Sequence, residues 1–246
     1  MTVPDWAAAV VAELRYPVVF ATVSGAHLYG FASVDSDLDL RGAHLLPLPE
    51  LVGLRHGPNH LRVDGIRDGV ELDVVTHELG RFCAMLLRPD GYVLEQLLSP
   101  LVVATSPVHA ELVGLAPRCV TRHHAHHYLG FARSQWMLHQ RTGELKPALY
   151  TLRVLLTGIN LMRTGELVAD LRRLPGAPPY VPELIGLKAA GEHRELPADL
   201  DLGGRLAADV AALTADLEQA RDASTLPEKP SAADALHDLV VRTRLA

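Results

Sequence analysis

The segment SGAHLYGFASVDSDLDLRG, residues 24–42, is the most informative part of this 246-residue chain. Its second half alternates apolar and polar side chains around Leu38 and Leu40, and this period of two predicts a half-buried strand. The preceding residues, 17–23, form a short apolar, β-branched run that predicts another strand. The segment therefore predicts two strands joined by a glycine-containing turn, and we expect a short helix to begin directly after Gly25.

Two aspartates, Asp37 and Asp39, lie one residue apart on the second predicted strand. Side chains at i and i+2 share one face of a strand and lie roughly 7 Å apart. Carboxylates this close raise each other's pKa unless a cation lies between them. We expect that cation to be Mg²⁺ (or Mn²⁺), because Mg²⁺ is a hard ion that takes oxygen ligands.

A candidate phosphate-binding turn precedes the aspartates. A strand, a glycine turn and a helix N-terminus leave free backbone N–H groups that can point at an anion. We therefore expect Ser24, Gly25 and Ala26 to bind the phosphates of a nucleoside triphosphate (NTP), and we assign Arg41 to the nucleotide as well. Each feature alone is common, since a solvated strand face explains most Asp-x-Asp pairs, but their order within about twenty residues favours a functional site.

A third carboxylate is expected, because two-metal phosphoryl transfer needs a ligand at the ion that activates the attacking oxygen. The best candidate is Asp73, in a run at residues 70–75 whose alternation predicts a strand after the hairpin signal at residues 68–69. A charged Asp73 among apolar neighbours is costly unless it is paired or bound to a metal. Glu71 shares the same strand face but lies nearer the turn, so it is the second candidate.

The turn, the Ser-Asp-x-Asp motif and the later single Asp resemble the nucleotidyltransferase superfamily that includes DNA polymerase β. More narrowly, residues 23–42 are similar to the RNA-ligase-associated (RlaP-like) group of predicted nucleotidyltransferases of bacteria and phages. The resemblance implies that Asp37 and Asp39 bind both metal ions, and that Asp73 binds one and helps to deprotonate the acceptor. At Ala26 the chain departs from the family, which usually has a serine whose hydroxyl contacts the triphosphate.

Predicted strands are confined to the first third of the chain, and from Thr121 the sequence is almost wholly helical in pattern. This order predicts an α+β fold, with a small mixed β-sheet nucleotidyltransferase core and flanking helices, followed by an all-helical C-terminal domain. We expect a catalytic domain at residues 1–110 and, at residues 111–246, a helical domain that closes the nucleotide cleft.

The helical half supplies a second set of candidates. Lys146, Tyr150 and Arg153 are spaced i, i+4 and i+7, so they share one helix face. Related nucleotidyltransferases use comparable residues to close the cleft, and this resemblance implies that the cations hold the triphosphate while Tyr150 stacks on the base. The alternative is an amphipathic helix with a solvated polar face. Residues 112–165 carry seven cations and one acid, a charge that suits triphosphate or a nucleic-acid end.

A histidine cluster at residues 123–127 invites a zinc-site interpretation, because His123 and His127 are four apart. No third ligand of suitable type is evident in the sequence, so we expect a solvated or phosphate-facing surface instead.

The composition limits the classes of protein. A net charge of −6 argues against a broad nucleic-acid footprint, and 48% hydrophobic residues suffice for a core. No stretch is long and apolar enough to span a bilayer, so no membrane partner is expected. Two cysteines do not make a disulfide framework, and we therefore expect a cytoplasmic protein.

Together these features predict an enzyme that transfers a nucleoside monophosphate from an NTP to a hydroxyl acceptor, with release of pyrophosphate. The acceptor stays open among an RNA or DNA end, a protein hydroxyl and a small molecule such as an aminoglycoside, and the subfamily name suggests an RNA ligase as partner. The alternative is a catalytically weak nucleotide-binding sensor, or an antitoxin-like docking module, on the same fold. A phosphohydrolase is the least favoured interpretation, because the chain lacks the His-Asp metal pairs that such enzymes use.

Overall fold

The structure is a computed structural model that describes residues 3–191, 195–196 and 202–245, and it divides into two compact units. The units interleave along the chain, so neither is one continuous segment. The expected division into a catalytic domain at 1–110 and a helical domain at 111–246 stays a prediction. Unit 1 comprises Met1–Leu28, Asp37–Cys119 and Lys229–Ala246, and unit 2 comprises Tyr29–Ser36 and Val120–Glu228.

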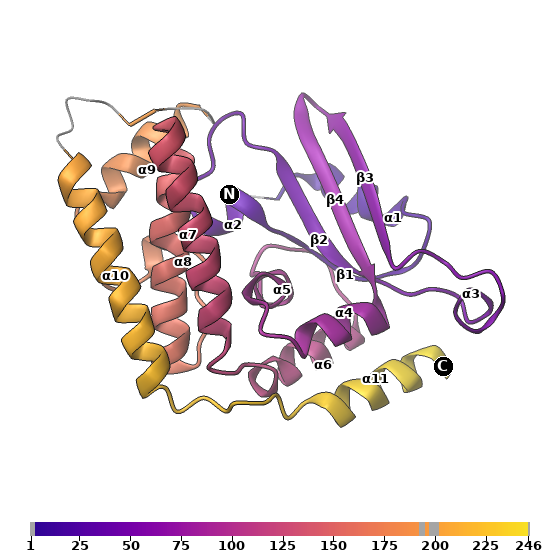
Figure 1. Ribbon diagram of the computed structural model, residues 1–246. Coiled ribbons are helices and arrows are strands. Elements are labelled where there is room, and N and C mark those ends of the chain that lie inside the picture. The colour runs from indigo at the N-terminus through magenta and orange to yellow at the C-terminus, as the bar shows by residue number, and fades with distance from the viewer. Residues whose placement is uncertain (1–2, 192–194, 197–201, 246) are drawn as a thin grey trace. The chain divides into compact units, whose positions relative to one another are not determined.

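Unit 1 is built on a mixed sheet, which in the described part of the chain has five strands in the order β3-β4-β2-β1-β5 (Figure 1). The β2–β4 pair is parallel, and the other neighbouring pairs are antiparallel. The α+β class with a small mixed sheet, predicted from the sequence, is confirmed. The strands are β1 (Val18–Val23), β2 (Leu38–His44), β3 (His60–Arg67), β4 (Val70–Glu78) and β5 (Val102–Ala104).

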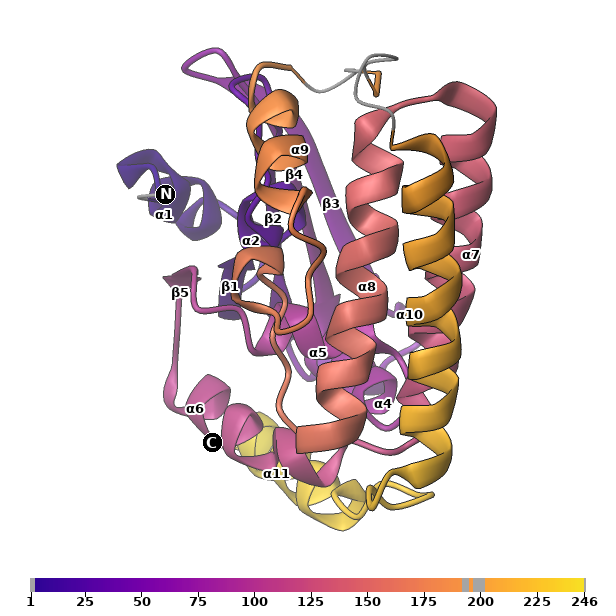
Figure 2. The same cartoon turned by 90° about the vertical axis from the view of Figure 1, so that its left-hand side faces the viewer.

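The helices of unit 1 cover both faces of this sheet. They are α1 (Asp5–Ala12), α2 (Gly25–Tyr29), α3 (Pro49–Val52), α4 (Leu79–Leu86), α5 (Gly91–Leu97), α6 (Pro107–Leu115) and α11 (Ala233–Leu245), with a 3₁₀ turn η1 (Ala116–Arg118). Helix α1 buries Val10 against Leu40 and Val74 of one face. The opposite face carries Phe20, whose ring meets Phe82 of α4 edge-on at 5.1 Å between centroids. Figures 1 and 2 show α1 on one side of the strands and α4 and α5 on the other.

The β3–β4 hairpin turns at the predicted position, with positive φ at both Asp68 (51°) and Gly69 (79°). Helix α4 begins directly after β4. Thr76 lies within β4, and its hydroxyl lies 2.9 Å from Nδ1 of His44. The cap is Glu78, whose carboxylate accepts from the backbone N–H of Arg81 at 3.1 Å.

Unit 2 is helical. Helices α7, α8 and α10 lie side by side in both views (Figures 1 and 2). Most side chains of α8 are buried, as expected for a helix surrounded by others. Of the helices in the described ranges, none is long and apolar enough to cross a membrane. The elements are α7 (His124–Thr142), α8 (Leu145–Thr164), η2 (Leu171–Arg173), α9 (Val181–Ala189) and α10 (Gly203–Ala223).

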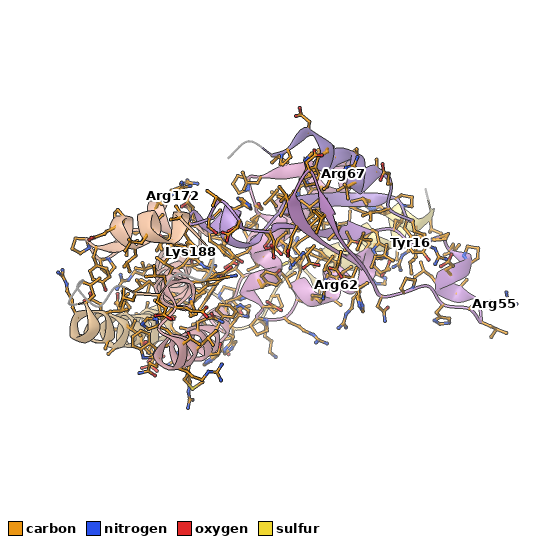
Figure 3. All side chains as sticks on the ribbon, turned by 90° about the horizontal axis from the view of Figure 1, so that it is seen from above. Tyr16, Arg55, Arg62, Arg67, Arg172 and Lys188 are labelled. Atoms are coloured by element: carbon orange, nitrogen blue, oxygen red, sulfur yellow. The ribbon has the colours of Figure 1, made fainter. Side chains whose placement is uncertain are left out.

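Helix α9 anchors the loop that leads into the Asp-x-Asp motif. Lys188 is fully buried within unit 2 (Figure 3), and its Nζ donates to Oγ of Ser33 at 2.8 Å. Oγ of Ser33 also lies 2.9 Å from Oγ of Ser36, and the N–H of Val34 donates to the carbonyl of Ala189 at 3.2 Å. A buried ammonium is costly unless it is hydrogen-bonded, so this loop conformation and the position of Lys188 depend on each other.

A Ser33→Ala substitution is therefore expected to lower the free energy of unfolding by about 2 kcal/mol, because it removes an acceptor from a buried charged donor. Urea denaturation followed by circular dichroism measures this difference. Ser134→Ala is the matched control, since that hydroxyl is exposed and donates to the carbonyl of Phe131 within α7. Equal stability of the two variants would show that the Lys188–Ser33 bond contributes nothing net.

Candidate active site

Strand pairing brings two of the predicted aspartates together. β2 and β4 are parallel neighbours in which Asp39 lies directly opposite Asp73. Adjacent strands are about 4.8 Å apart, so these two side chains project from the same sheet face at close range. The register is fixed because each strand buries its alternate residues on the other face. These buried residues are Leu38, Leu40, Leu72 and Val74.

Arg41 joins the two carboxylates. Its Nη2 lies 2.7 Å from Oδ1 of Asp39 and 2.7 Å from Oδ2 of Asp73. Its Nη1 donates to the carbonyls of Asp73 (2.7 Å) and Leu40 (3.0 Å), and its Nε donates to the hydroxyl of Tyr92 at 2.9 Å. Burial opposes the charge, but Tyr92, Asp39 and Asp73 together raise the pKa of the Arg41 guanidinium above its usual value. The guanidinium is a permanent cation between the two acids.

A second ion pair flanks the site from β3. Asp64 lies opposite Asp73 in the antiparallel β3–β4 pair, and Arg62 Nε contacts Oδ1 of Asp64 at 2.9 Å. The Arg62 hydrogen bond lowers the pKa of the Asp64 carboxyl. Both side chains are about 60% exposed, at 62% and 60%, so this pair belongs to the solvated rim. Sequence reasoning missed both residues and Tyr92: alternation along β3 gave a weak signal for Arg62 and Asp64, and Tyr92 gave none.

Asp37 differs from Asp39 and Asp73 in its solvent exposure. It is exposed and directly precedes β2, whereas Asp39 and Asp73 are partly buried. Within residues 3–191, 195–196 and 202–245, no three His, Cys, Asp or Glu side chains are arranged to hold a metal ion. Glu71, the second candidate for the third acid, is exposed. A three-carboxylate metal site at Asp37, Asp39 and Asp73 therefore stays a prediction.

The glycine turn is shaped by Asp39. Gly25 has φ +63°, and a Cβ placed on it would lie 1.9 Å from Oδ2 of Asp39. The N–H of Ser24 donates to the carbonyl of Asp39 at 2.9 Å, and the side chains of Ser24 and Ala26 are buried. Only glycine fits at position 25, because the carboxylate occupies the space of a side chain. Phosphate binding by Ser24, Gly25 and Ala26 stays a prediction.

The candidates on α8 pack within unit 2. The ring of Tyr150 contacts Tyr29 and Phe31, with centroid separations of 5.5 Å and 5.2 Å. The guanidinium of Arg153 lies 3.8 Å from the ring centroid of Tyr29 and is 3% exposed, while Lys146 is half-buried. The shared face of this helix is thus largely a packed aromatic cluster instead of a solvated one. Nucleotide binding by Lys146, Tyr150 and Arg153 stays a prediction.

The histidine cluster at the start of α7 is divided between surface and core. His124 is buried, and its Nδ1 accepts from the backbone N–H of Thr121 at 3.1 Å. His123 and His126 stack with ring centroids 5.9 Å apart, and the ring of His127 meets Tyr128 edge-on.

The pair of Asp39 and Asp73 suits a hard divalent cation. Oδ1 of Asp73 is buried and forms an ion pair with Nε of Arg62 at 3.3 Å, but it accepts no hydrogen bond from the residues that the structure describes. A buried carboxylate oxygen that accepts no hydrogen bond keeps capacity for a further ligand. Carboxylate oxygens are the ligands that Mg²⁺ prefers, so the donors that the strands bring together fit the expected ion.

A mixed sheet that carries Ser-Asp-x-Asp at the start of one strand, with a further Asp in register on the next, is typical of polymerase-β-like nucleotidyltransferases. The chain belongs to the RlaP family, the RNA repair pathway DNA polymerase beta family, whose model matches residues 5–242. An uncharacterized protein of Methanocaldococcus jannaschii is 27% identical over 216 residues, which cover 87% of this chain and 88% of that protein. A nucleotidyltransferase-like protein from Exiguobacterium sibiricum, solved by crystallography, is 10% identical with a TM-score of 0.31, covering 96% of this chain and 76% of its own.

Proposed function

We propose that this chain transfers a nucleoside monophosphate from an NTP to a hydroxyl acceptor and releases pyrophosphate, in a reaction that depends on Mg²⁺ or Mn²⁺. The observation that carries the proposal is the pair of carboxylates, Asp39 and Asp73, held in register on parallel strands around one cation. Membership of a polymerase-β family supports the same reaction class.

In this reaction the acceptor oxygen forms a bond to the α-phosphorus, and the bond from that phosphorus to the bridging oxygen of pyrophosphate breaks. Asp37, Asp39 and Asp73 would hold the divalent ions. Bound there, the ions would neutralise charge on the triphosphate and polarise its phosphoryl oxygens. A carboxylate oxygen of Asp73 would accept the proton of the acceptor hydroxyl. Backbone N–H groups at Gly25 and Ala26 would hold the phosphates.

The acceptor class that we favour is an RNA or DNA end. The family description names RNA repair, and α7 with α8 supplies most of the cations that outnumber acids in residues 112–165. The exposed cations among them, such as Arg133 and Arg141 of α7, are of the kind that binds phosphate backbones without reading sequence. An RNA ligase as partner and a cytoplasmic location belong to the same proposal.

Transfer of label tests the proposal. The protein is incubated with each α-labelled NTP, Mg²⁺ or Mn²⁺, and total RNA or DNA oligonucleotides, and both labelled nucleic acid and free pyrophosphate are measured. We expect label transfer with release of pyrophosphate, and none in the Asp37→Asn plus Asp39→Asn double variant. Transfer that survives in the double variant would rule out this site.

A nucleotide sensor is the second candidate function, and the position of Arg41 favours it. The guanidinium already pairs with both carboxylates and offsets part of their charge, so the fold does not require a metal ion there. Nucleotide binding measured by calorimetry, without transfer of label to any acceptor, would support the sensor and contradict the enzyme.

A further inference from the structure

Arg41 makes more contacts at the candidate site than a surface arginine needs. Its Nη2 contacts the carboxylates of Asp39 and Asp73, and its Nε donates to Tyr92. Its Nη1 donates to two backbone carbonyls, and its side chain is only 11% exposed. A guanidinium held on all sides in this way is fixed in one position. It is fixed on Oδ1 of Asp39 and Oδ2 of Asp73, that is, on the two carboxylates that the proposed function assigns to divalent ions.

The two acids repel each other unless a cation lies between them. Their carboxylates are 27% and 24% exposed, so water screens their repulsion only in part. In the absence of metal, Arg41 supplies that charge. A divalent ion coordinated by the same two carboxylates would lie within a few ångströms of the guanidinium, and two cations so close repel each other strongly. Arg41 and the ion therefore compete for Asp39 and Asp73.

We infer that Arg41 is a built-in counter-ion that holds Asp39 and Asp73 in the metal-free protein and releases them to a divalent ion when a triphosphate arrives. This inference rests on the proposed function, because it takes the two acids to be metal ligands. The triphosphate offers Arg41 an alternative partner, since guanidinium groups pair well with phosphate oxygens. Arg41 is thus a positioning residue that makes metal binding depend on the nucleotide.

Tyr92 is the third side chain that holds the Arg41 guanidinium, besides Asp39 and Asp73. Its hydroxyl, on α5, accepts from Nε of Arg41 at 2.9 Å, while the two acids lie on the sheet. Loss of that hydroxyl would loosen the guanidinium without removing its charge. The structure therefore offers two graded variants, Arg41→Gln, which removes the internal cation, and Tyr92→Phe, which removes one of its supports.

Manganese binding measured by calorimetry and by electron paramagnetic resonance tests the inference without turnover. In the parent protein, we expect weak Mn²⁺ binding that tightens at least about tenfold when a non-hydrolysable NTP analogue is present. In Arg41→Gln, Mn²⁺ alone should bind at least about tenfold more tightly than in the parent, because its internal competitor is gone. In this variant the NTP analogue should tighten Mn²⁺ binding much less than it does in the parent.

Two further variants locate the effect. Arg62→Gln is the matched control, because Arg62 also lies near Asp73, at 3.3 Å, but is 62% exposed; its Mn²⁺ affinity should stay within about threefold of the parent. Adding Asp39→Asn to Arg41→Gln should abolish the gained affinity. Unchanged or weaker Mn²⁺ binding in Arg41→Gln would overturn the inference, as would an equal gain in Arg62→Gln.

The experiment separates this inference from the proposed function. If Arg41→Gln bound Mn²⁺ tightly but the parent transferred no nucleotide, the counter-ion role of Arg41 would be supported and the proposed enzymatic activity would be contradicted. If the parent transferred nucleotide but Arg41→Gln bound Mn²⁺ no more tightly than the parent, the enzymatic activity would be supported and the counter-ion role would be contradicted. If Arg41→Gln does not fold without metal, Tyr92→Phe carries the test, and an Mn²⁺ affinity equal to that of the parent in this variant overturns the inference.

Discussion

An Asp73→Asn variant is expected to lose nucleotidyl transfer by roughly 10³-fold while it keeps its fold. The substitution preserves the shape of the side chain, but it removes the charge that would bind the ion and the oxygen that would accept the proton. Stabilisation by a metal ion is worth several kcal/mol in the transition state, and each 1.36 kcal/mol corresponds to about a factor of ten in rate. Single-turnover release of pyrophosphate measures the loss.

Asp64→Asn is the matched control for this prediction. Asp64 lies directly opposite Asp73 on β3, but it is 60% exposed and forms its ion pair with Arg62. Its transfer rate should stay within about threefold of the parent, as expected for a solvated ion pair. If Asp64→Asn and Asp73→Asn lost activity equally, the third acid would be misassigned or the effect would be a general change in surface charge.

The local elements of the site could be predicted from the sequence because their signals are local. Alternation of Leu38 and Leu40 with Asp37 and Asp39 gave β2, and the Asp-Gly pair before Val70 gave the β3–β4 hairpin. The same alternation puts Arg41 on the face of Asp39, although the sequence analysis assigned it to nucleotide alone. Its contact with Asp73 depends on which strand pairs with β2 and in which direction, and no local pattern encodes that choice.

The interleaving of the two units lay beyond sequence reasoning for a similar reason. The loop at residues 29–36 lies between two motif segments of unit 1, yet it packs with unit 2 through Tyr29 on Arg153 and Ser33 on Lys188. These partners are more than a hundred residues away along the chain. A buried lysine is also unexpected from composition, because lysine is rarely buried without a partner, and its partner becomes apparent only in the folded chain.

Gly42→Ala is expected to destabilise unit 1 by about 3 kcal/mol, a large effect for one methyl group. Gly42 lies in β2, and a Cβ placed on it would be 2.0 Å from the carbonyl oxygen of Phe20 in β1. The obstructing atom belongs to the backbone of a central strand, so no side-chain rotation relieves the overlap. The β1–β2 pair must separate instead, and its hydrogen bonds weaken. The midpoint of urea denaturation measures the loss.

Gly65→Ala provides the comparison, since it makes the same change in the same sheet. Gly65 lies on the exposed strand β3, where an added Cβ meets no atom within 4 Å. The free energy of unfolding of this variant should match that of the parent or exceed it by up to about 1 kcal/mol, because alanine loses less conformational entropy on folding than glycine does.

Strand separation at Gly42 would also displace the neighbouring Arg41, so Gly42→Ala should weaken the nucleotide dependence of Mn²⁺ binding as well. If Gly42→Ala proved as stable as Gly65→Ala, β1 and β2 could not be packed as closely as the structure has them. The position of Arg41 between Asp39 and Asp73, which depends on that packing, would then be in question.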